Sequence, residues 1–311
     1  MLVDEILNND MPPEKKDFFL SYDEFISIFW KYKGLIKERE RNNNFWESTN
    51  NNLKLAYEQL HEKEQELEYA YALIRDDLAL ANKIQKILLP STLKELENKI
   101  DIDIVIYNKQ LTEVGGDYYD YFRTKSNNYA VGLFDISGHG VSAALVMVYL
   151  KSQLMQALNI YTSPKKIISY VNEISLSFLR EAKKYATVNF VLFEKNLIRY
   201  ICGGGNGFII NKNKTEYFIK KDSFLGLRNI KFSEYELPFN KGDLLVLYTD
   251  GIIEAQNNKG IDFSAKRLHR IMQDNFDKPL EKILENCIND YKKFRSKDLD
   301  DITLILLRKK D

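Results

Sequence analysis

Aspartates stand at the ends of several apolar, strand-like runs in this sequence. Asp117 follows a glycine pair in EVGGDYYDYF, and Asp135 closes the run in GLFDISGHG. Asp250 directly follows an apolar run in LYTDGIIEA, and Asp300 and Asp301 directly precede another in KDLDDITLILL. Each stretch taken singly is typical of a turn, because Gly-Gly-Asp and Thr-Asp-Gly are favoured turn sequences. Packed sheets would gather such strand ends, however, and clustered carboxylates repel one another unless a cation lies among them. The shared placement therefore predicts a metal site.

The composition restricts which metal such a site could hold. The chain has 311 residues, with three histidines and two cysteines. Cys202 and Cys287 are too few for a disulfide framework or a four-cysteine zinc site. His61, His139 and His269 are likewise too few for clustered His/Cys ligation. Carboxylates would have to hold the metal, which favours the hard cations Mg²⁺ or Mn²⁺ over zinc.

Charge and hydropathy exclude several other classes. Lys plus Arg and Asp plus Glu both number 45, so no global basic excess indicates nucleic-acid binding. The first ten residues, MLVDEILNND, carry acids where a signal peptide needs a basic start and an apolar core. The longest apolar stretches are interrupted by Asp135 or Asp250, so we expect no membrane span. These features favour a cytoplasmic protein.

Residues 1–90 have the periodicity of helices, and part of this region repeats every seven residues. The repeat consists of Leu53, Leu60, Leu67 and Ile74. Such a repeat makes an apolar seam that only a partner helix can cover, although one amphipathic helix lying on its own domain is an alternative. We predict a small helical segment over 1–50, a break between helices at the polar run RNNN, a coiled-coil or linker helix over 51–90, and a homodimer through residues 50–80.

Pro90 ends the helical region, and the pattern then changes to strands over residues 91–311. DIDIVIY, YAVGLF, TVNFVLF, LIRYICG, GFII, DLLVLY and ITLILL are strand-like runs in hairpin-like succession. Helical patterns are interleaved unevenly, and VSAALVMVYLKSQLMQAL is apolar on almost every side, which predicts a deeply buried helix. This order favours an α+β domain with mostly antiparallel sheets.

Four of these stretches, in this order, resemble a known family. The set GGDYYDYF, FDISGHGVSAALVM, LYTDGIIEA and DDITLIL is similar to the metal-dependent protein phosphatases of the type 2C superfamily, in the bacterial SpoIIE-like and RsbU-like serine phosphatase branch. The likeness covers roughly residues 79–309 and includes ANKIQKILLP, similar to the helix that leads into this domain. It implies a sandwich of two mostly antiparallel β-sheets flanked by helices, with two Mn²⁺ or Mg²⁺ ions at a hydrolytic centre.

The resemblance assigns roles to individual residues. Asp135 matches the aspartate that bridges both metals, and the carbonyl of Ile136 is expected as a further ligand. Asp117 and Asp250 match two more metal-binding acids. Two cations about 3.5–4 Å apart can share a water, lower its pKa and aim it at phosphorus, so Asp135 and Asp250 carry the catalysis and no covalent phosphoenzyme is needed.

The remaining site residues are less determined. Asp300 matches the first acid of the final pair, with Asp301 as the alternative for that role. His139 is either a proton donor to the leaving serine oxygen or a loop histidine with a structural hydrogen bond. The chain has GGGNG at 203–207 where relatives often have Ala-Gly-His-Asn-Pro, and Gln110-Leu111 where Pro-Ala is common. No arginine clearly takes a phosphate-clamping role, which leaves that task to the metals.

The resemblance further implies the substrate class. We expect a phosphoserine or phosphothreonine on a bacterial regulatory protein of the anti-sigma-factor-antagonist type, in a partner-switching pathway. Two alternatives keep the fold without turnover: a catalytically inactive pseudophosphatase, and a coiled-coil scaffold that acts as a binding module in the same pathway. The presence of every expected acid favours the enzyme.

Overall fold

The computed structural model describes residues 21–90, 94–211, 214–218 and 222–310, and the chain divides into two units, Met1–Ile74 and Arg75–Asp311. Helix α2, Tyr22–Leu88, is unbroken, so the predicted break at RNNN is wrong. Asparagine lowers helix stability by less than about 1 kcal/mol, and without Gly or Pro in this run the backbone hydrogen bonds continue. The start of the predicted 1–50 segment, residues 1–20, lies outside the described residues.

The heptad positions of α2 carry exposed apolar side chains in the first unit. We call Leu53, Leu60, Leu67 and Ile74 the apolar seam; Leu60 is 55% exposed and Leu67 is 57% exposed. Charged residues lie beside the seam, including the pair Lys63 and Glu66. The predicted helix is confirmed, and the dimer stays a prediction.

The described residues of the second unit form two five-stranded sheets in which every strand pairing is antiparallel. The first sheet has the order β1 (Ile102–Lys109), β10 (Ile302–Lys309), β9 (Leu244–Tyr248), β6 (Asn206–Ile210) and β7 (Thr215–Tyr217). The second has the order β2 (Tyr118–Arg123), β3 (Tyr129–Ile136), β4 (Ala186–Phe193), β5 (Leu197–Gly203) and β8 (Tyr235–Pro238). The predicted α+β sandwich is confirmed.

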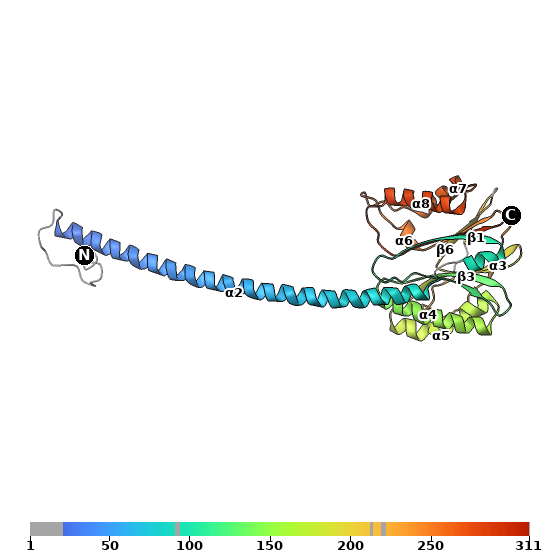
Figure 1. The fold of residues 1–311 in the computed structure, drawn as a ribbon, viewed down its shortest axis with the longest axis horizontal. Helices are drawn as coiled ribbons and strands as arrows, with labels where there is room; N and C mark the ends of the chain where they lie inside the picture. Colours follow the sequence, from blue (N-terminus) through green and yellow to red (C-terminus); the bar gives the residue numbers. More distant parts are fainter. Residues whose placement is uncertain (1–20, 91–93, 212–213, 219–221, 311) are drawn as a thin grey trace. The chain divides into compact units, whose positions relative to one another are not determined.

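Helices cover the outer faces of both sheets (Figure 1). α4 (Val141–Ile160) and α5 (Pro164–Glu181) lie on the second sheet, and α7 (Ala265–Asp274) and α8 (Leu280–Phe294) lie on the first. Two short helices, α3 (Lys94–Ile100) and α6 (Asp250–Ile253), lie at strand ends. Every residue of β9 is buried, because one face of its sheet meets the other sheet and the opposite face meets the helices. This explains its continuous apolar run.

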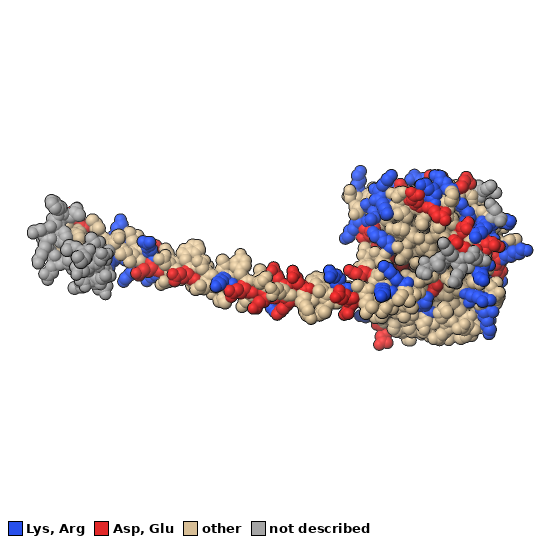
Figure 2. Space-filling view, viewed as in Figure 1, with Lys and Arg blue, Asp and Glu red and all other residues tan. Residues whose placement is uncertain are grey.

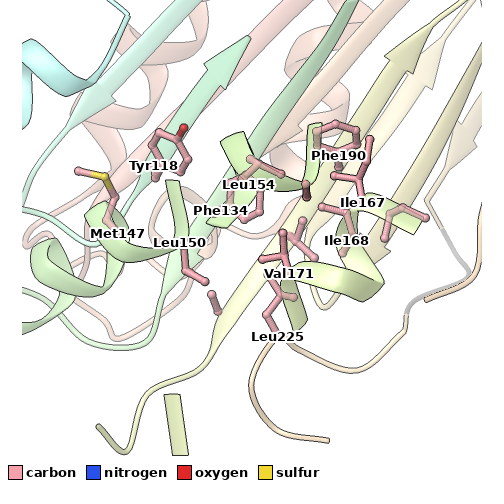
Figure 3. Close-up of a cluster of buried hydrophobic side chains, with 14 of the residues drawn as sticks. Tyr118, Phe134, Met147, Leu150, Leu154, Ile167, Ile168, Val171, Phe190 and Leu225 are labelled. Atoms are coloured by element: carbon pink, nitrogen blue, oxygen red, sulfur yellow. The ribbon is translucent and has the colours of Figure 1, made fainter. Parts of the chain in front are cut away.

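The core under α4 and α5 shows how the helices are attached (Figure 3). Phe134 and Phe190 of the sheet pack with Leu150 and Leu154 of α4 and with Val171 of α5. Fully burying one such side chain contributes about 1.5–3 kcal/mol. The layer therefore holds the end of β3, and with it Asp135, in a fixed position.

The predicted deep burial of α4 on nearly every side is wrong. Met147 and Leu150 are buried, whereas Leu145 is 65% exposed and Met155 is 48% exposed. A helix on the outside of a sheet buries only the stripe that faces it, whatever the composition of the rest. Of the described helices, α4 is the one long and apolar enough to cross a membrane by length and composition, and a core helix passes the same test.

Candidate metal centre

Strand pairing brings the predicted acids together at the ends of neighbouring strands in each sheet. Asp117 immediately precedes β2, and Asp135 is near the end of β3, whose Phe134 pairs with Tyr118. In the other sheet, Asp250 begins α6 just after β9, and β9 pairs with the start of β10, which follows Asp300 and Asp301. Acids distant in the sequence thus become neighbours within each sheet.

Electrostatic interactions show that these strand ends of the two sheets also lie near each other. Burial raises the pKa of Asp135, and the charges of Asp117, Asp250 and Asp300 raise it further, as does a hydrogen bond with Asp250. Burial likewise raises the pKa of Asp117, with contributions from the charges of Asp301 and Asp300. The pKa of Asp300 is raised by burial and by the charge of Asp250. We call Asp117, Asp135, Asp250 and Asp300 the acid cluster.

The donor set of the cluster suits a hard divalent cation. Its side chains are carboxylates, and carboxylate and carbonyl oxygens are the ligands of Mg²⁺, Mn²⁺ and Ca²⁺. Within the described ranges no three His, Cys, Asp or Glu side chains are gathered tightly enough to hold a metal ion. The raised pKa values follow from burial and from mutual repulsion of the carboxylates, and a bound cation would offset that repulsion. The chemistry of the donor set therefore fits a hard divalent cation.

Two threonines hold Asp117 in place. Asp117 is 1% exposed, and its Oδ2 accepts hydrogen bonds from Thr249 Oγ1 at 2.9 Å and Thr303 Oγ1 at 2.6 Å. Thr303 Oγ1 in turn accepts from Asn108 Nδ2 at 2.8 Å. Sequence reasoning missed both threonines, although each stands inside a quoted motif, directly before Asp250 and two residues after Asp301. Their hydroxyls fix the orientation of one carboxylate of the cluster.

Asp300 and Asp301 have different surroundings. Asp301 is 3% exposed; its Oδ1 accepts from the backbone N–H of Leu111 at 2.7 Å and its Oδ2 from that of Gly116 at 2.6 Å. Asp300 Oδ1 accepts from the N–H of Asp301 at 2.8 Å, and its carboxylate senses the charge of Asp250. Both oxygens of Asp301 are thus engaged by the loop before Asp117, whereas Asp300 faces the cluster.

Two glycines allow the backbone segments around the cluster to approach closely. A Cβ on Gly116 would lie 2.7 Å from the carbonyl oxygen of Ile136, which is the predicted metal-binding carbonyl. A Cβ on Gly251 would lie 2.0 Å from the carbonyl oxygen of Asp301. Real Cβ atoms do not come this near to backbone, so any side chain at either position would push the strand ends apart.

His139 lies in the turn after Asp135, between two glycines with left-handed φ angles of 78° and 80°. Its ring is exposed, and its charge lowers the pKa of Asp300, against the larger raising effect of burial. The histidine is therefore beside the acid cluster. The GGGNG segment connects β5 of one sheet to β6 of the other, and Asn189 Nδ2 donates to the Asn206 carbonyl at 2.9 Å.

The end of α2 is bonded to the loop that precedes Asp117. Gln85 is buried; its Oε1 accepts from the Gly115 N–H at 3.1 Å, and its Nε2 donates to the Gly115 carbonyl at 2.7 Å. Gln110 Nε2 donates to Gln85 Oε1 at 2.7 Å, and Asn82 Nδ2 donates to Gln110 Oε1 at 3.1 Å. The departure at Gln110 is thus accommodated by amides of the helix. The signal for Gln85 was its place within ANKIQKILLP.

The fold has close counterparts among solved structures. The SiaA-PP2C domain of Pseudomonas aeruginosa superimposes with a TM-score of 0.68 at 22% identity, covering 77% of this chain and 98% of that one. The PP2C domain of SpoIIE from Bacillus subtilis, solved with a fragment of its regulatory domain, gives 0.56 at 19%, covering 67% and 63%. The catalytic domain of PstP, in complex with two manganese ions, gives 0.50 at 11%, covering 68% and 99%. The second unit has the PP2C fold.

Sequence relatives agree with the structural ones. The phosphoserine phosphatase RsbU of Bacillus subtilis is 23% identical over 263 residues, which is 82% of this chain and 77% of RsbU. RsbP of the same organism, also a phosphoserine phosphatase, is 24% identical over 220 residues, covering 68% of this chain and 52% of RsbP. Fold and relatives define the class as type 2C protein serine/threonine phosphatase. Residues 125–310 match the family model of Stage II sporulation protein E (SpoIIE), and the chain belongs to that family.

Proposed function

We propose that the chain hydrolyses a phosphoserine or phosphothreonine on a regulatory protein, with two Mn²⁺ or Mg²⁺ ions held by the acid cluster. The observation that carries this proposal is the convergence of Asp117 and Asp135 from one sheet with Asp250 and Asp300 from the other. The manganese pair in the PstP catalytic domain and the activity of RsbU and RsbP support it.

The surroundings of each acid suggest its role. Asp135 senses the charges of all three other members, so it would hold the metal pair from the centre of the cluster, with the Ile136 carbonyl as a further ligand. Asp117, Asp250 and Asp300 complete the ligand set. Asp301 acts as a positioning residue, because both of its oxygens accept backbone N–H groups of the loop that carries Asp117.

The chemistry then follows from a few groups. A bound pair of divalent cations lowers the pKa of a water and neutralises charge on the phosphoryl oxygens. Thr249 and Thr303 keep the Asp117 carboxylate aimed into the cluster through their hydrogen bonds. His139, exposed and close to Asp300, would give a proton to the departing serine oxygen, a general-acid role that a histidine side chain can take.

The substrate is proposed to be a phosphorylated regulator of the anti-sigma-factor-antagonist type, in line with the similarity to RsbU and RsbP. The enzyme is proposed to act in the cytoplasm, since two cysteines are too few for the disulfide framework of a small secreted protein and α4 contributes its apolar stripe to the core. An inactive scaffold would not need all four acids of the cluster, so their presence favours an enzyme over a scaffold.

The N-terminal region is proposed to form a homodimer through residues 50–80, with the apolar seam covered by the same seam of a second chain. α2 has no interruption between this seam and Gln85, whose amide holds both backbone groups of Gly115. A packed helix with such contacts can transmit a change at one end to a loop at the other. Dimer geometry would then influence how well the Asp117 loop is ordered.

Hydrolysis of para-nitrophenyl phosphate by the purified full-length chain tests the proposed function. We expect turnover that requires Mn²⁺ or Mg²⁺, stops on addition of a chelator and returns when metal is restored. Turnover that is insensitive to the chelator would contradict a metal centre. Absence of turnover on this ester and on phosphoserine peptides, at any metal concentration that stabilises the protein, would favour the inactive scaffold.

A further inference from the structure

A lysine lies at the same strand ends as the acid cluster. Strand β4 begins at Ala186, which pairs with Ile136 at the end of β3. One step further, the N–H of Ser137 donates to the Tyr185 carbonyl at 2.9 Å, and the N–H of Tyr185 donates to Ser137 Oγ at 3.0 Å. Lys184 is therefore the first residue beyond this pairing, at the end of the sheet where Asp135 stands.

The Lys184 ammonium lies against the turn that follows Asp135. Its Nζ donates to the Ser137 carbonyl at 2.8 Å, and a Cβ built on Gly138 would lie 3.0 Å from that Nζ. The same turn packs against the loop before Asp117, since a Cβ on Gly116 would lie 3.0 Å from the Gly138 carbonyl oxygen. The Lys184 side chain is half-buried, so the surrounding protein restricts its position.

The charge of Lys184 is not neutralised by a neighbouring acid. Among residues 21–90, 94–211, 214–218 and 222–310 no ion pair involves Lys184, whereas Lys109 and Lys151 each pair with an aspartate. An ammonium has three N–H donors, and the Ser137 carbonyl accepts from one. A half-buried cation with spare donors, held against the turn that follows Asp135, is a binding group for an anion that arrives at these strand ends.

The charge balance of the proposed reaction calls for such a group. Four carboxylates and two divalent cations have no net formal charge, so a phosphomonoester brings about −1.5 to −2 charges into a neutral site. Lysine is a common point-charge partner of phosphate. The sequence has no arginine that clearly takes this role.

We propose that Lys184 binds a phosphoryl oxygen of the substrate and so selects dianionic phosphomonoesters over less charged phosphodiesters. The proposal deepens the phosphatase function above and rests on it. Because the ammonium is anchored by the Ser137 carbonyl, it is already in place before substrate arrives, which reduces the entropy lost on binding.

The test compares Lys184→Met with Lys184→Arg in the full-length, Mn²⁺-loaded enzyme. Lys183→Met is the matched control, because Lys183 is the adjacent lysine and is exposed. Kinetics on para-nitrophenyl phosphate give KM and kcat, inhibition by inorganic phosphate gives Ki, and bis-para-nitrophenyl phosphate gives the monoester-to-diester preference. Thermal unfolding of each variant reports stability.

We expect Lys184→Met to raise KM for the monoester and Ki for inorganic phosphate about tenfold or more, the size of a lost charge-assisted hydrogen bond. The monoester preference should fall by a similar factor, and Lys184→Arg should restore most of all three. Lys183→Met should behave as wild type. A lysine that only braces the turn would lower stability or kcat in Lys184→Met and leave Ki and the monoester preference unchanged, which would overturn the proposal.

The outcomes separate the two proposals. An active, metal-dependent wild type with an unchanged Ki in Lys184→Met contradicts the role of Lys184 alone. A wild type without metal-dependent turnover contradicts the proposed function, and the role of Lys184 fails with it.

Discussion

The acid cluster and the apolar seam of α2 depart from ordinary side-chain placement in opposite directions. Asp117 is 1% exposed although carboxylates are rarely fully buried without a partner of opposite charge, while Leu60 in the seam is 55% exposed although leucine is usually inside. Each placement is unfavourable for an isolated chain. A buried group of like charges is stabilised by a cation, and a regular exposed apolar row is stabilised by a second helix.

The difference lies in how each feature is built. The acid cluster is assembled by strands distant in the sequence and is braced by groups such as Thr303 and Asp301, so its geometry belongs to the fold of one unit. The seam is local, since its residues recur along one helix and need no other part of the chain to align them. Mutations in the acid cluster should therefore change metal binding and turnover, and mutations in the apolar seam should change the association of two chains.

The largest expected effect is the loss of activity in Asp135→Asn. Removing the charge of the central carboxylate should lower kcat on the order of 1,000-fold in steady-state assays, because metal binding and charge neutralisation both depend on it. Asp243→Asn is the matched control: Asp243 is also a buried acid, but it accepts from the Asn240 N–H at 2.8 Å outside the cluster. Full turnover by Asp135→Asn would remove the cluster from catalysis.

The next prediction separates the two acids of the final pair. Asp300→Asn should keep the fold and raise the Mn²⁺ concentration needed for half-maximal activity by roughly tenfold or more, because a charged ligand is lost. Asp301→Ala should lower the free energy of unfolding by about 2–4 kcal/mol, because the buried N–H of Gly116 and the half-buried N–H of Leu111 lose their acceptor. Metal titrations and urea unfolding measure the two effects. If Asp301→Ala instead raised the Mn²⁺ requirement and Asp300→Asn lowered the free energy of unfolding, Asp301 would be the metal ligand and Asp300 the positioning residue.

Thermal stability should depend on pH and metal together. Burial and repulsion raise the folded-state pKa of Asp117 and Asp135 above the ordinary aspartate value, so the folded state binds more protons than the unfolded one between the two values. Without metal, Tm should therefore fall as pH rises from about 4 through neutrality.

Added Mn²⁺ competes with those protons, so its stabilising increment should grow with pH and with metal concentration. Differential scanning fluorimetry at pH 5, 6, 7 and 8, with chelator or Mn²⁺, measures both trends. In Asp117→Ala/Asp250→Ala the increment should disappear. An increment independent of pH would mean that the metal binds elsewhere.

The smallest expected effect on turnover comes from the seam. Leu60→Asp/Leu67→Asp should convert a dimer to a monomer in light scattering, because charges cannot be buried between paired helices. Turnover should fall only severalfold, since the acid cluster is built within each chain. Leu55→Asp/Leu73→Asp is the control, because both leucines are more than half exposed on α2 but lie off the seam. If both double variants have the same molar mass and the same turnover, the seam is not a dimer interface.

Local patterns in the sequence were sufficient for most elements of the second unit. Alternating and continuous apolar runs predicted β1, β3, β4, β5, β6, β9 and β10, and aspartates marked the ends of several strands; the short strands β7 and β8 were not predicted. The same reasoning failed for α4, because composition shows that a helix is apolar but not which side meets a sheet; Leu145 and Met155 are exposed. It also failed at RNNN, where weak helix formers lie within a long helix and are carried by its continuous hydrogen bonding.

The sequence by itself determined the chemistry available at the site: carboxylates at strand ends, close glycines beside them, and too few histidines and cysteines for another kind of metal site. Only the tertiary structure decided which groups meet. Thr303 bonds Asp117 across 186 residues, and Asp301 bonds Gly116 across 185. Such contacts depend on the pairing of distant strands and the packing of two sheets. Local periodicity does not encode that arrangement, because it reports only which face of each strand is buried.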